Sequence, residues 1–212
     1  MVKWFSENPL KRKWKNLCHN HIPPQEFEAD PRIVSWIGFC IFGGMKTIYF
    51  NRHAKSDWSH DDLRDFDRPL NNRGFRDAPK MGERLKQRGE KIDQFISSPA
   101  KRAITTARLM ADKYNFPVDE IKEVERLYLP SIGSFLDTIS ETDESHRSVI
   151  LFAHNPGITE VVEYLSGEEI GNIPTCGIAK IEFASANNWN EISAETGKMI
   201  FFDFPKNDNP FN

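Results

Sequence analysis

The sequence has few cysteines and almost no excess of charge of either sign. Its three cysteines are widely spaced and odd in number, which argues against a disulfide framework and favours a reducing compartment. The formal net charge of −3 provides no basic field that would attract nucleic acid or an anionic membrane. We therefore expect a cytoplasmic protein that binds neither nucleic acid nor membrane.

A long apolar run is also missing. The segment Ile33–Met45 is apolar over thirteen residues, whereas a membrane-spanning helix needs roughly 20. A secretory signal would lie nearer the start of the chain and would end in a small-residue cleavage site. The run predicts a segment that packs on the domain, or one with no function of its own.

Residues 1–44 differ from the rest of the chain in their hydrophobic pattern. They show no sustained hydrophobic period before Ile33, and the basic cluster Lys11–Lys15 is typical of a solvated turn. We expect residues 1–44 to be a poorly ordered or loosely packed extension. It is either genuine or the product of an upstream start-site assignment, and the second reading is favoured. Residues 45–212 then form the working domain.

From residue 46 onward, strand and helix patterns alternate. The run Ser148–Ala153 is continuously apolar, as expected for a strand that is buried on both faces. Such alternation predicts an α/β fold with three α/β/α layers and a mostly parallel central sheet. The expected strands are 46–51, 91–97, 118–124, 148–153, 177–183 and 199–204, and the expected helices are 72–88, 99–114, 131–140 and 156–165. In helix 72–88 the apolar stripe is Phe75, Ala78, Met81 and Leu85.

Cationic or potentially cationic side chains follow three of the expected strands. Arg52 and His53 come after the first strand, Arg102 lies in the first turn of the helix after the second, and His154 follows the buried strand. Ligands of such sheets bind beyond the carboxyl ends of the strands, so we expect these four side chains to converge. Ser56 and Asn155, close to the two histidines in the sequence, are further expected substrate ligands.

Four such groups at one mouth would repel one another unless an anion lies between them. A phosphoryl group is the natural occupant, because the planar guanidinium of Arg matches phosphate oxygens. The sequence has no Walker loop and no paired Asp/Glu cluster, so we expect side chains alone to handle the phosphate, without a metal or other cofactor. The charge of Arg52 favours the neutral, nucleophilic form of His53.

These residues resemble the histidine phosphatase superfamily, which includes the phosphoglycerate mutases. The family's Arg-His signature is Arg52-His53, and its S-S-P-x-x-R-A-x-x-T-A run is matched over 97–107, with Arg102 as the arginine. The resemblance covers roughly residues 46–204. It implies that His53 is the catalytic nucleophile that becomes phosphorylated, and that Arg52, Arg102 and His154 hold the phosphoryl oxygens.

Two segments, "RHAKSDW" and "DRPLNNRG" at 67–74, resemble the small SixA-like phosphohistidine phosphatases.

One departure from the family pattern concerns the general acid. Many members carry a glutamate that protonates the leaving group, usually after a Leu-Tyr pair, but here Leu129 follows that pair. Glu125 and Asp57 are nearby candidates for this acid. A missing acid fits a phosphoramidate better than an ester, because imidazole protonates readily near neutral pH.

The leading hypothesis is thus a metal-independent phosphatase that acts through a phosphohistidine enzyme intermediate. Its substrate would be protein phosphohistidine or a related small phosphorylated compound. Two alternatives stay open at this point. One is a phosphomonoesterase for sugar phosphates or nucleotides, and the other is a non-catalytic module that binds phosphorylated partners.

Overall fold

The computed structural model describes residues 45–59 and 62–210, and these residues build a six-stranded sheet. The expected extension at 1–44 lies outside the described residues. The strands are β1 (Lys46–Arg52), β2 (Gln94–Ser97), β3 (Lys122–Glu123), β4 (Ser148–Ala153), β5 (Ile178–Phe183) and β6 (Lys198–Asp203). Their order across the sheet is β3-β2-β4-β1-β5-β6.

Most of the sheet is parallel, as the alternating pattern predicts. β1 pairs in parallel with β4, and β2 pairs in parallel with both β4 and β3. Strand β5 runs antiparallel to β1 and to β6. The carboxyl ends of β1, β2 and β4 therefore meet at one edge of the sheet, where the residues that follow them lie close together.

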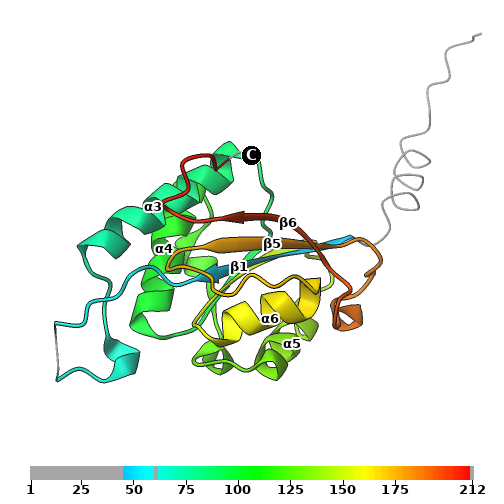
Figure 1. Cartoon of the computed structure of the whole chain (residues 1–212), viewed down its shortest axis with the longest axis horizontal. Coiled ribbons are helices and arrows are strands. Elements are labelled where there is room, and N and C mark those ends of the chain that lie inside the picture. Colours follow the sequence, from blue (N-terminus) through cyan, green and yellow to red (C-terminus); the bar gives the residue numbers. More distant parts are fainter. Residues whose placement is uncertain (1–44, 60–61, 211–212) are drawn as a thin grey trace, which may run out of the picture. The chain divides into compact units, whose positions relative to one another are not determined.

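Helices cover both faces of this sheet, and the predicted three-layer α/β/α arrangement is confirmed (Figure 1). One face carries α3 (Asn72–Gln87) and α4 (Lys101–Tyr114), and the other carries α5 (Ile132–Ser140) and α6 (Gly157–Ser166). The 3-10 helices are η1 (Asp65–Asp67), η2 (Val118–Glu120), η3 (Glu125–Leu127) and η4 (Trp189–Glu191). No helix in the described ranges has the length and apolar character that crossing a bilayer requires.

Successive residues of the central strands supply two separate hydrophobic cores. In β1, Ile48 and Phe50 pack with the α5/α6 layer, whereas Tyr49 packs with the α3/α4 layer. In β4, Leu151 and Phe152 divide in the same way, and all six residues of this strand are buried. The period-2 geometry of a strand explains this division, because neighbouring side chains point to opposite faces.

Two local expectations are wrong. The segment 118–124 holds η2 and the two-residue strand β3, because its charged residues offer no alternating buried face at the sheet edge. Phe75 is 49% exposed, although it belongs to the predicted stripe of α3. The buried stripe passes through Gly74, Ala78, Met81 and Leu85, so residue 75 lies about 100° from the first member of that stripe.

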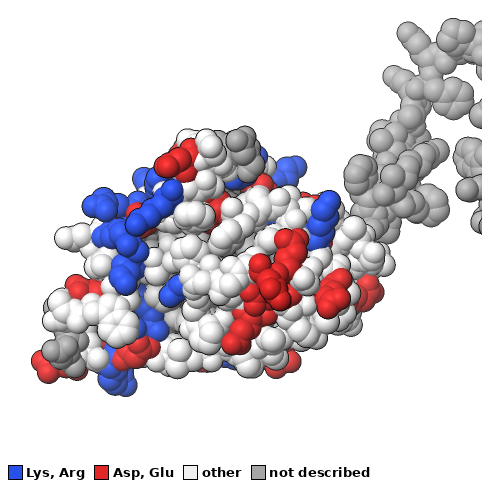
Figure 2. Space-filling model, viewed as in Figure 1, with Lys and Arg blue, Asp and Glu red and all other residues white. Residues whose placement is uncertain are grey.

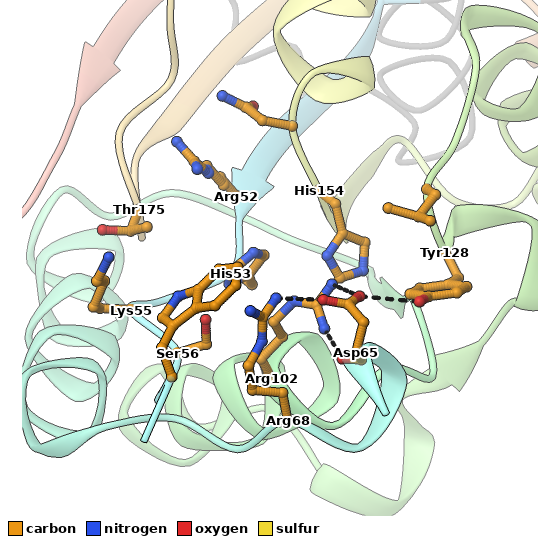
Figure 3. Close-up of a pocket in the computed structure, with 13 residues that line it drawn as sticks. Arg52, His53, Lys55, Ser56, Asp65, Arg68, Arg102, Tyr128, His154 and Thr175 are labelled. Atoms are coloured by element: carbon orange, nitrogen blue, oxygen red, sulfur yellow. Dashed lines mark hydrogen bonds and ion pairs between the residues drawn. The ribbon is translucent and has the colours of Figure 1, made fainter. Parts of the chain in front are cut away.

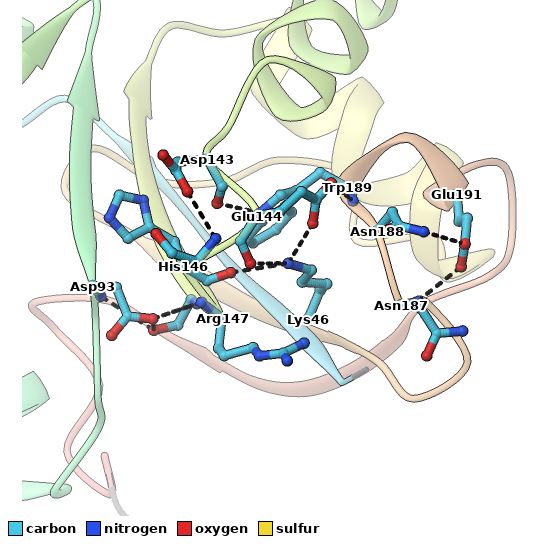
Figure 4. A network of polar contacts seen from close by, with 12 residues as sticks. Lys46, Asp93, Asp143, Glu144, His146, Arg147, Asn187, Asn188, Trp189 and Glu191 are labelled. Carbon is cyan, nitrogen blue, oxygen red and sulfur yellow. Dashed lines mark hydrogen bonds and ion pairs between the residues drawn. The ribbon is translucent and has the colours of Figure 1, made fainter. Parts of the chain in front are cut away.

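At the amino ends of the strands, a buried lysine connects three separate segments (Figure 4). Lys46 is fully buried, donates to the carbonyl of His146 at 3.0 Å and pairs with the carboxylate of Glu144 at 2.8 Å. Its Nζ also lies 4.6 Å from the ring centroid of Trp189, whose indole N–H donates to the carbonyl of Asp143. Because its charge is partnered, this cation holds the turn before β4 against η4.

Helix α3 packs against α4 closely enough to require glycine at one position. A Cβ at Gly82 would lie 2.5 Å from the carbonyl oxygen of Met110. We expect Gly82→Ala to lower the free energy of unfolding by about 1–3 kcal/mol through overpacking, as measured by urea denaturation. Gly133→Ala is the matched control, because the nearest atom to its Cβ is 3.7 Å away. Equal stabilities of the two variants would contradict the close packing of α3 on α4.

Candidate active site

A pocket of about 380 Å³ lies at the carboxyl ends of β1 and β4 (Figure 3). It contains all six predicted phosphate-site residues, namely Arg52, His53, Ser56, Arg102, His154 and Asn155. The other described lining residues are Lys55, Trp58, Asp65, Arg68, Tyr128, Leu129 and Thr175. Segments that are far apart in the sequence therefore meet at one site, as the strand-end argument predicts.

His53 lies directly after β1 and is nearly buried. Its Nδ1 is 2.7 Å from the carbonyl oxygen of Ala54. A carbonyl only accepts, so Nδ1 must donate, and in the neutral ring Nε2 then carries the lone pair. Burial, opposed by the Ala54 hydrogen bond and assisted by the charges of Arg102 and Arg52, lowers the pKa of His53 to about 3. The ring is therefore neutral at ordinary pH and has a lone pair on Nε2, as a nucleophile requires.

His154 follows β4, and its ring centroid lies 5.0 Å from that of His53. Its Nε2 is 2.9 Å from the hydroxyl oxygen of Ser98, which belongs to the loop after β2. Burial lowers the pKa of His154 to about 2, with further contributions from His53 and Arg102. Both imidazoles of the pocket are thus uncharged, which limits repulsion among its cationic groups.

Arg52, the last residue of β1, is held by the loop that precedes β5. Its guanidinium donates to the carbonyl of Ile173 at 2.7 Å and to Oδ1 of Asn172 at 3.4 Å. Asn155 donates to that same Oδ1 at 2.6 Å, and its own Oδ1 accepts from Thr159 at 3.0 Å. Asn155 lines the pocket, but these bonds also make it a support for the loop that orients Arg52.

Arg102 is buried in the first turn of α4, and a threonine of the same motif ties this turn to the His53 loop. The hydroxyl of Thr106 accepts from the backbone N–H of Ala54 at 3.0 Å and donates to the carbonyl of Arg102 at 2.7 Å. These two bonds give the threonine four residues after Arg102 a structural role.

Among the polar side chains in the pocket that the sequence-based set lacks, Arg68 and Tyr128 both contact Asp65. Oδ2 of Asp65 accepts from Arg102 at 2.8 Å and from the hydroxyl of Tyr128 at 3.0 Å. Arg68 pairs with the same carboxylate and stacks 3.5 Å above the ring of Trp58. Arg68 belongs to the quoted "DRPL" run, but no period or spacing in the sequence connects Asp65 to Arg102.

The two suggested general acids lie elsewhere. Glu125 is exposed on η3, and Oδ1 of Asp57 accepts from the backbone and hydroxyl of Ser59. Leu129 instead lines the pocket, with a φ of 48° in the left-handed region. Within the described part of the chain, no group of three His, Cys, Asp or Glu side chains has a metal-binding arrangement.

Several buried nitrogen atoms of the lining residues have no hydrogen-bond partner among the described residues. They are Nε of Arg52, Arg68 and Arg102 and Nδ1 of His154. Buried polar atoms without a partner are uncommon in folded proteins. The three guanidinium nitrogens at this pocket can donate to an oxygen-rich anion.

The lowered pKa of His53 makes a prediction about stability. The folded-state pKa is about 3 against an ordinary 6.5, so between these values the folded chain binds fewer protons than the unfolded chain. The stability associated with neutral His53 is therefore complete above about pH 6.5 and declines as the pH falls toward 3. The stability difference between the wild type and His53→Asn should change over that range in urea denaturation. Parallel stability curves would contradict the depressed pKa.

Comparison with known proteins agrees with this geometry. The sequence profile described as "Histidine phosphatase superfamily (branch 1)" matches residues 48–127. An uncharacterized chloroplastic protein of Arabidopsis thaliana is 32% identical over 158 residues, which cover 69% of this chain and 70% of that protein. An uncharacterized protein of Mycobacterium leprae is 28% identical over 167 residues, which cover 73% of this chain and 99% of that protein.

Solved structures share the fold. The phosphohistidine phosphatase assigned as SixA in Agrobacterium tumefaciens superposes with a TM-score of 0.63 at 26% identity, covering 74% of this chain and 97% of that chain. The protein histidine phosphatase SixA complexed with tungstate has a TM-score of 0.64 at 23% identity, covering 75% and 97%. From the profile match, the Arabidopsis relative and the shared fold, we conclude that the chain belongs to the histidine phosphatase superfamily and is a hydrolase that acts on phosphoryl groups.

Proposed function

We propose that this histidine phosphatase transfers a phosphoryl group from protein phosphohistidine, or a related phosphorylated compound, first to His53 and then to water. The observation that carries the proposal is the tautomer of His53. The 2.7 Å contact between Nδ1 and the carbonyl of Ala54 leaves the lone pair on Nε2. Two guanidinium groups, of Arg52 and Arg102, line the same pocket and are available to the phosphoryl oxygens.

The first step forms the bond between Nε2 of His53 and phosphorus, with the lone pair of Nε2. The bond between phosphorus and the substrate nitrogen breaks, and its electron pair stays with the leaving imidazole. Arg52 and Arg102 balance the charge on the phosphoryl oxygens. In the second step water attacks phosphorus and the electron pair of the P–N bond returns to Nε2. Both protons of the water leave with the phosphate as dihydrogen phosphate.

Two observations support a phosphoramidate substrate. Leu129 lines the pocket at the position after the Leu-Tyr pair. At this position the family resemblance implies a glutamate that protonates the leaving group. An alkoxide needs a proton donor when it leaves, whereas an imidazole leaves readily near neutral pH. The solved relative at 26% identity is described as a phosphohistidine phosphatase, which agrees with this choice.

The surface around the pocket fits an anionic partner. Lys and Arg side chains gather over α3 on the face in Figure 2, and Asp and Glu side chains gather over α6. The chain is slightly acidic overall, so this local cationic area would direct a phosphorylated partner toward one side of the molecule. A cytoplasmic location stays a prediction from the low cysteine content.

Acid-quench trapping tests the covalent step. After incubation with a labelled phosphohistidine protein, His53 should carry acid-labile phosphate, and His53→Ala should carry none and lose turnover. Turnover of phosphohistidine without any label on His53 would contradict the mechanism. Phosphate binding with no turnover would favour the non-catalytic module instead.

Arg102 should contribute strongly to transition-state stabilisation, because its buried guanidinium faces the phosphoryl site. We expect Arg102→Ala to lower kcat by about 10²–10³-fold, as for loss of a preorganised donor. Arg108→Ala is the matched control on the same helix, since that side chain is 54% exposed and pairs with Glu123. Equal losses in both variants, measured by steady-state kinetics, would remove Arg102 from the mechanism.

A further inference from the structure

Asp65 supplies the one carboxylate among the described residues that line the pocket (Figure 3). It is the first residue of η1, and its carboxylate is in contact with three donors. Oδ2 accepts from Arg102 at 2.8 Å and from Tyr128 at 3.0 Å, while Oδ1 pairs with Arg68. The backbone carbonyl of Asp65 also accepts from Arg102, so the position of this residue is fixed at both its main chain and its side chain.

These contacts keep the carboxylate ionised. Burial by itself would raise the pKa of Asp65, but the hydrogen bonds from Tyr128 and Arg102, together with the charges of Arg102 and Arg68, lower it overall. Burial and the same Asp65 bond raise the pKa of Tyr128, which therefore keeps its proton. Among the described residues, His154 is a further titratable group that interacts with Asp65. Asp65 is thus an acceptor near neutral pH and a poor source of protons.

Asp65 lies nearer the mouth of the pocket than His53, Arg102 and His154. His53, Arg102 and His154 are 8%, 2% and 2% exposed, whereas the side chain of Asp65 is 44% exposed. Trp58 and Leu129, which also line the pocket, are more exposed still. In phosphoryl transfer the leaving group lies roughly in line with the nucleophile and on its far side. With His53 on the buried floor, the leaving group must occupy the mouth, beside Asp65.

We propose that Asp65 determines substrate specificity by accepting a hydrogen bond from the distal ring nitrogen of a phosphohistidine leaving group. The same fixed carboxylate disfavours leaving groups that develop negative charge, such as the alkoxide of a phosphate ester. This inference rests on the proposed function and names its substrate class. It adds a role to a residue that the sequence pattern does not reveal.

The chemistry balances without a proton donor in the pocket. A phosphohistidine whose distal nitrogen is protonated has a cationic ring. When the N–P bond breaks, its electron pair enters that ring and neutral imidazole departs with its proton still on the distal nitrogen. A carboxylate that accepts from this N–H raises the pKa of the bound ring and holds the substrate in the form that can leave. An ester gains nothing from Asp65, because its leaving oxygen needs a proton that a carboxylate cannot give.

The test compares two substrates that differ in the leaving group. We expect Asp65→Asn to lower the ratio of kcat/KM for phosphohistidine over that for phosphoserine by about 10–100-fold, the scale of a hydrogen bond to a charged group. Asp67→Asn is the matched control on η1, because Asp67 pairs with the exposed Arg64 at 2.7 Å and does not line the pocket. Asp67→Asn should leave the ratio within about twofold of the wild type. Asp65→Ser replaces Asp65→Asn if the latter fails to fold.

A pH profile separates this role from a structural one. The alkaline limit of kcat for phosphohistidine should move to lower pH in Asp65→Asn, because the bound ring loses its proton more easily without the carboxylate. The alkaline limit should stay in place in Asp67→Asn. An unchanged alkaline limit in Asp65→Asn would overturn the proposal.

Two other outcomes would also overturn it. If Asp65→Asn impairs phosphoserine more than phosphohistidine, Asp65 acts as a general acid. If the Asp65→Asn variant hydrolyses both substrates faster by the same factor and binds inorganic phosphate more tightly, the Asp65 carboxylate competes with phosphate for Arg102. Failure of the proposed function is distinct, because wild-type His53 would then carry no phosphate from either substrate.

Discussion

The site depends on keeping one imidazole neutral among several arginines. Without its hydrogen bond to the carbonyl of Ala54, His53 could place its proton on either ring nitrogen, and only one tautomer presents the lone pair of Nε2. Burial opposes a charge on the ring, and the nearby guanidinium groups oppose it further. The guanidinium charges that help to exclude a proton from His53 also favour an anionic substrate, so the neutral imidazole and the proposed phosphate site share that cause.

The surrounding fold can be understood as support for this arrangement. Parallel pairing of β4 with both β1 and β2 brings the loops after three strands to one edge. Thr106 then joins the first turn of α4 to the backbone after His53, and Asn155 helps hold the loop that orients Arg52. Asp65 balances the charge of Arg102 and Arg68 at the mouth. Each contact fixes a charged or nucleophilic group at a set position, which reduces the reorganisation required during transfer.

The sequence predicted the parts that follow from periodicity and strand direction. The run Ser148–Ala153 matches β4 residue for residue, and the expected helix 131–140 is α5 (Ile132–Ser140). Convergence of the strand-end residues followed from the parallel sheet alone. The contact of Asp65 with Arg102 could not be predicted in this way, because it joins a loop without a period to a helix 37 residues away. Lys46 is a similar case, since a lysine at the start of a strand gives no sign that it will be buried.

The central claim is most directly tested by the ring nitrogens of His53, observed by ¹H–¹⁵N NMR at roughly pH 6, close to the ordinary pKa of histidine. The account predicts a neutral ring, with a proton on Nδ1 and a lone pair on Nε2, and His53→Asn identifies the signal. An imidazolium with both nitrogens protonated, or a neutral ring with its proton on Nε2, would contradict it.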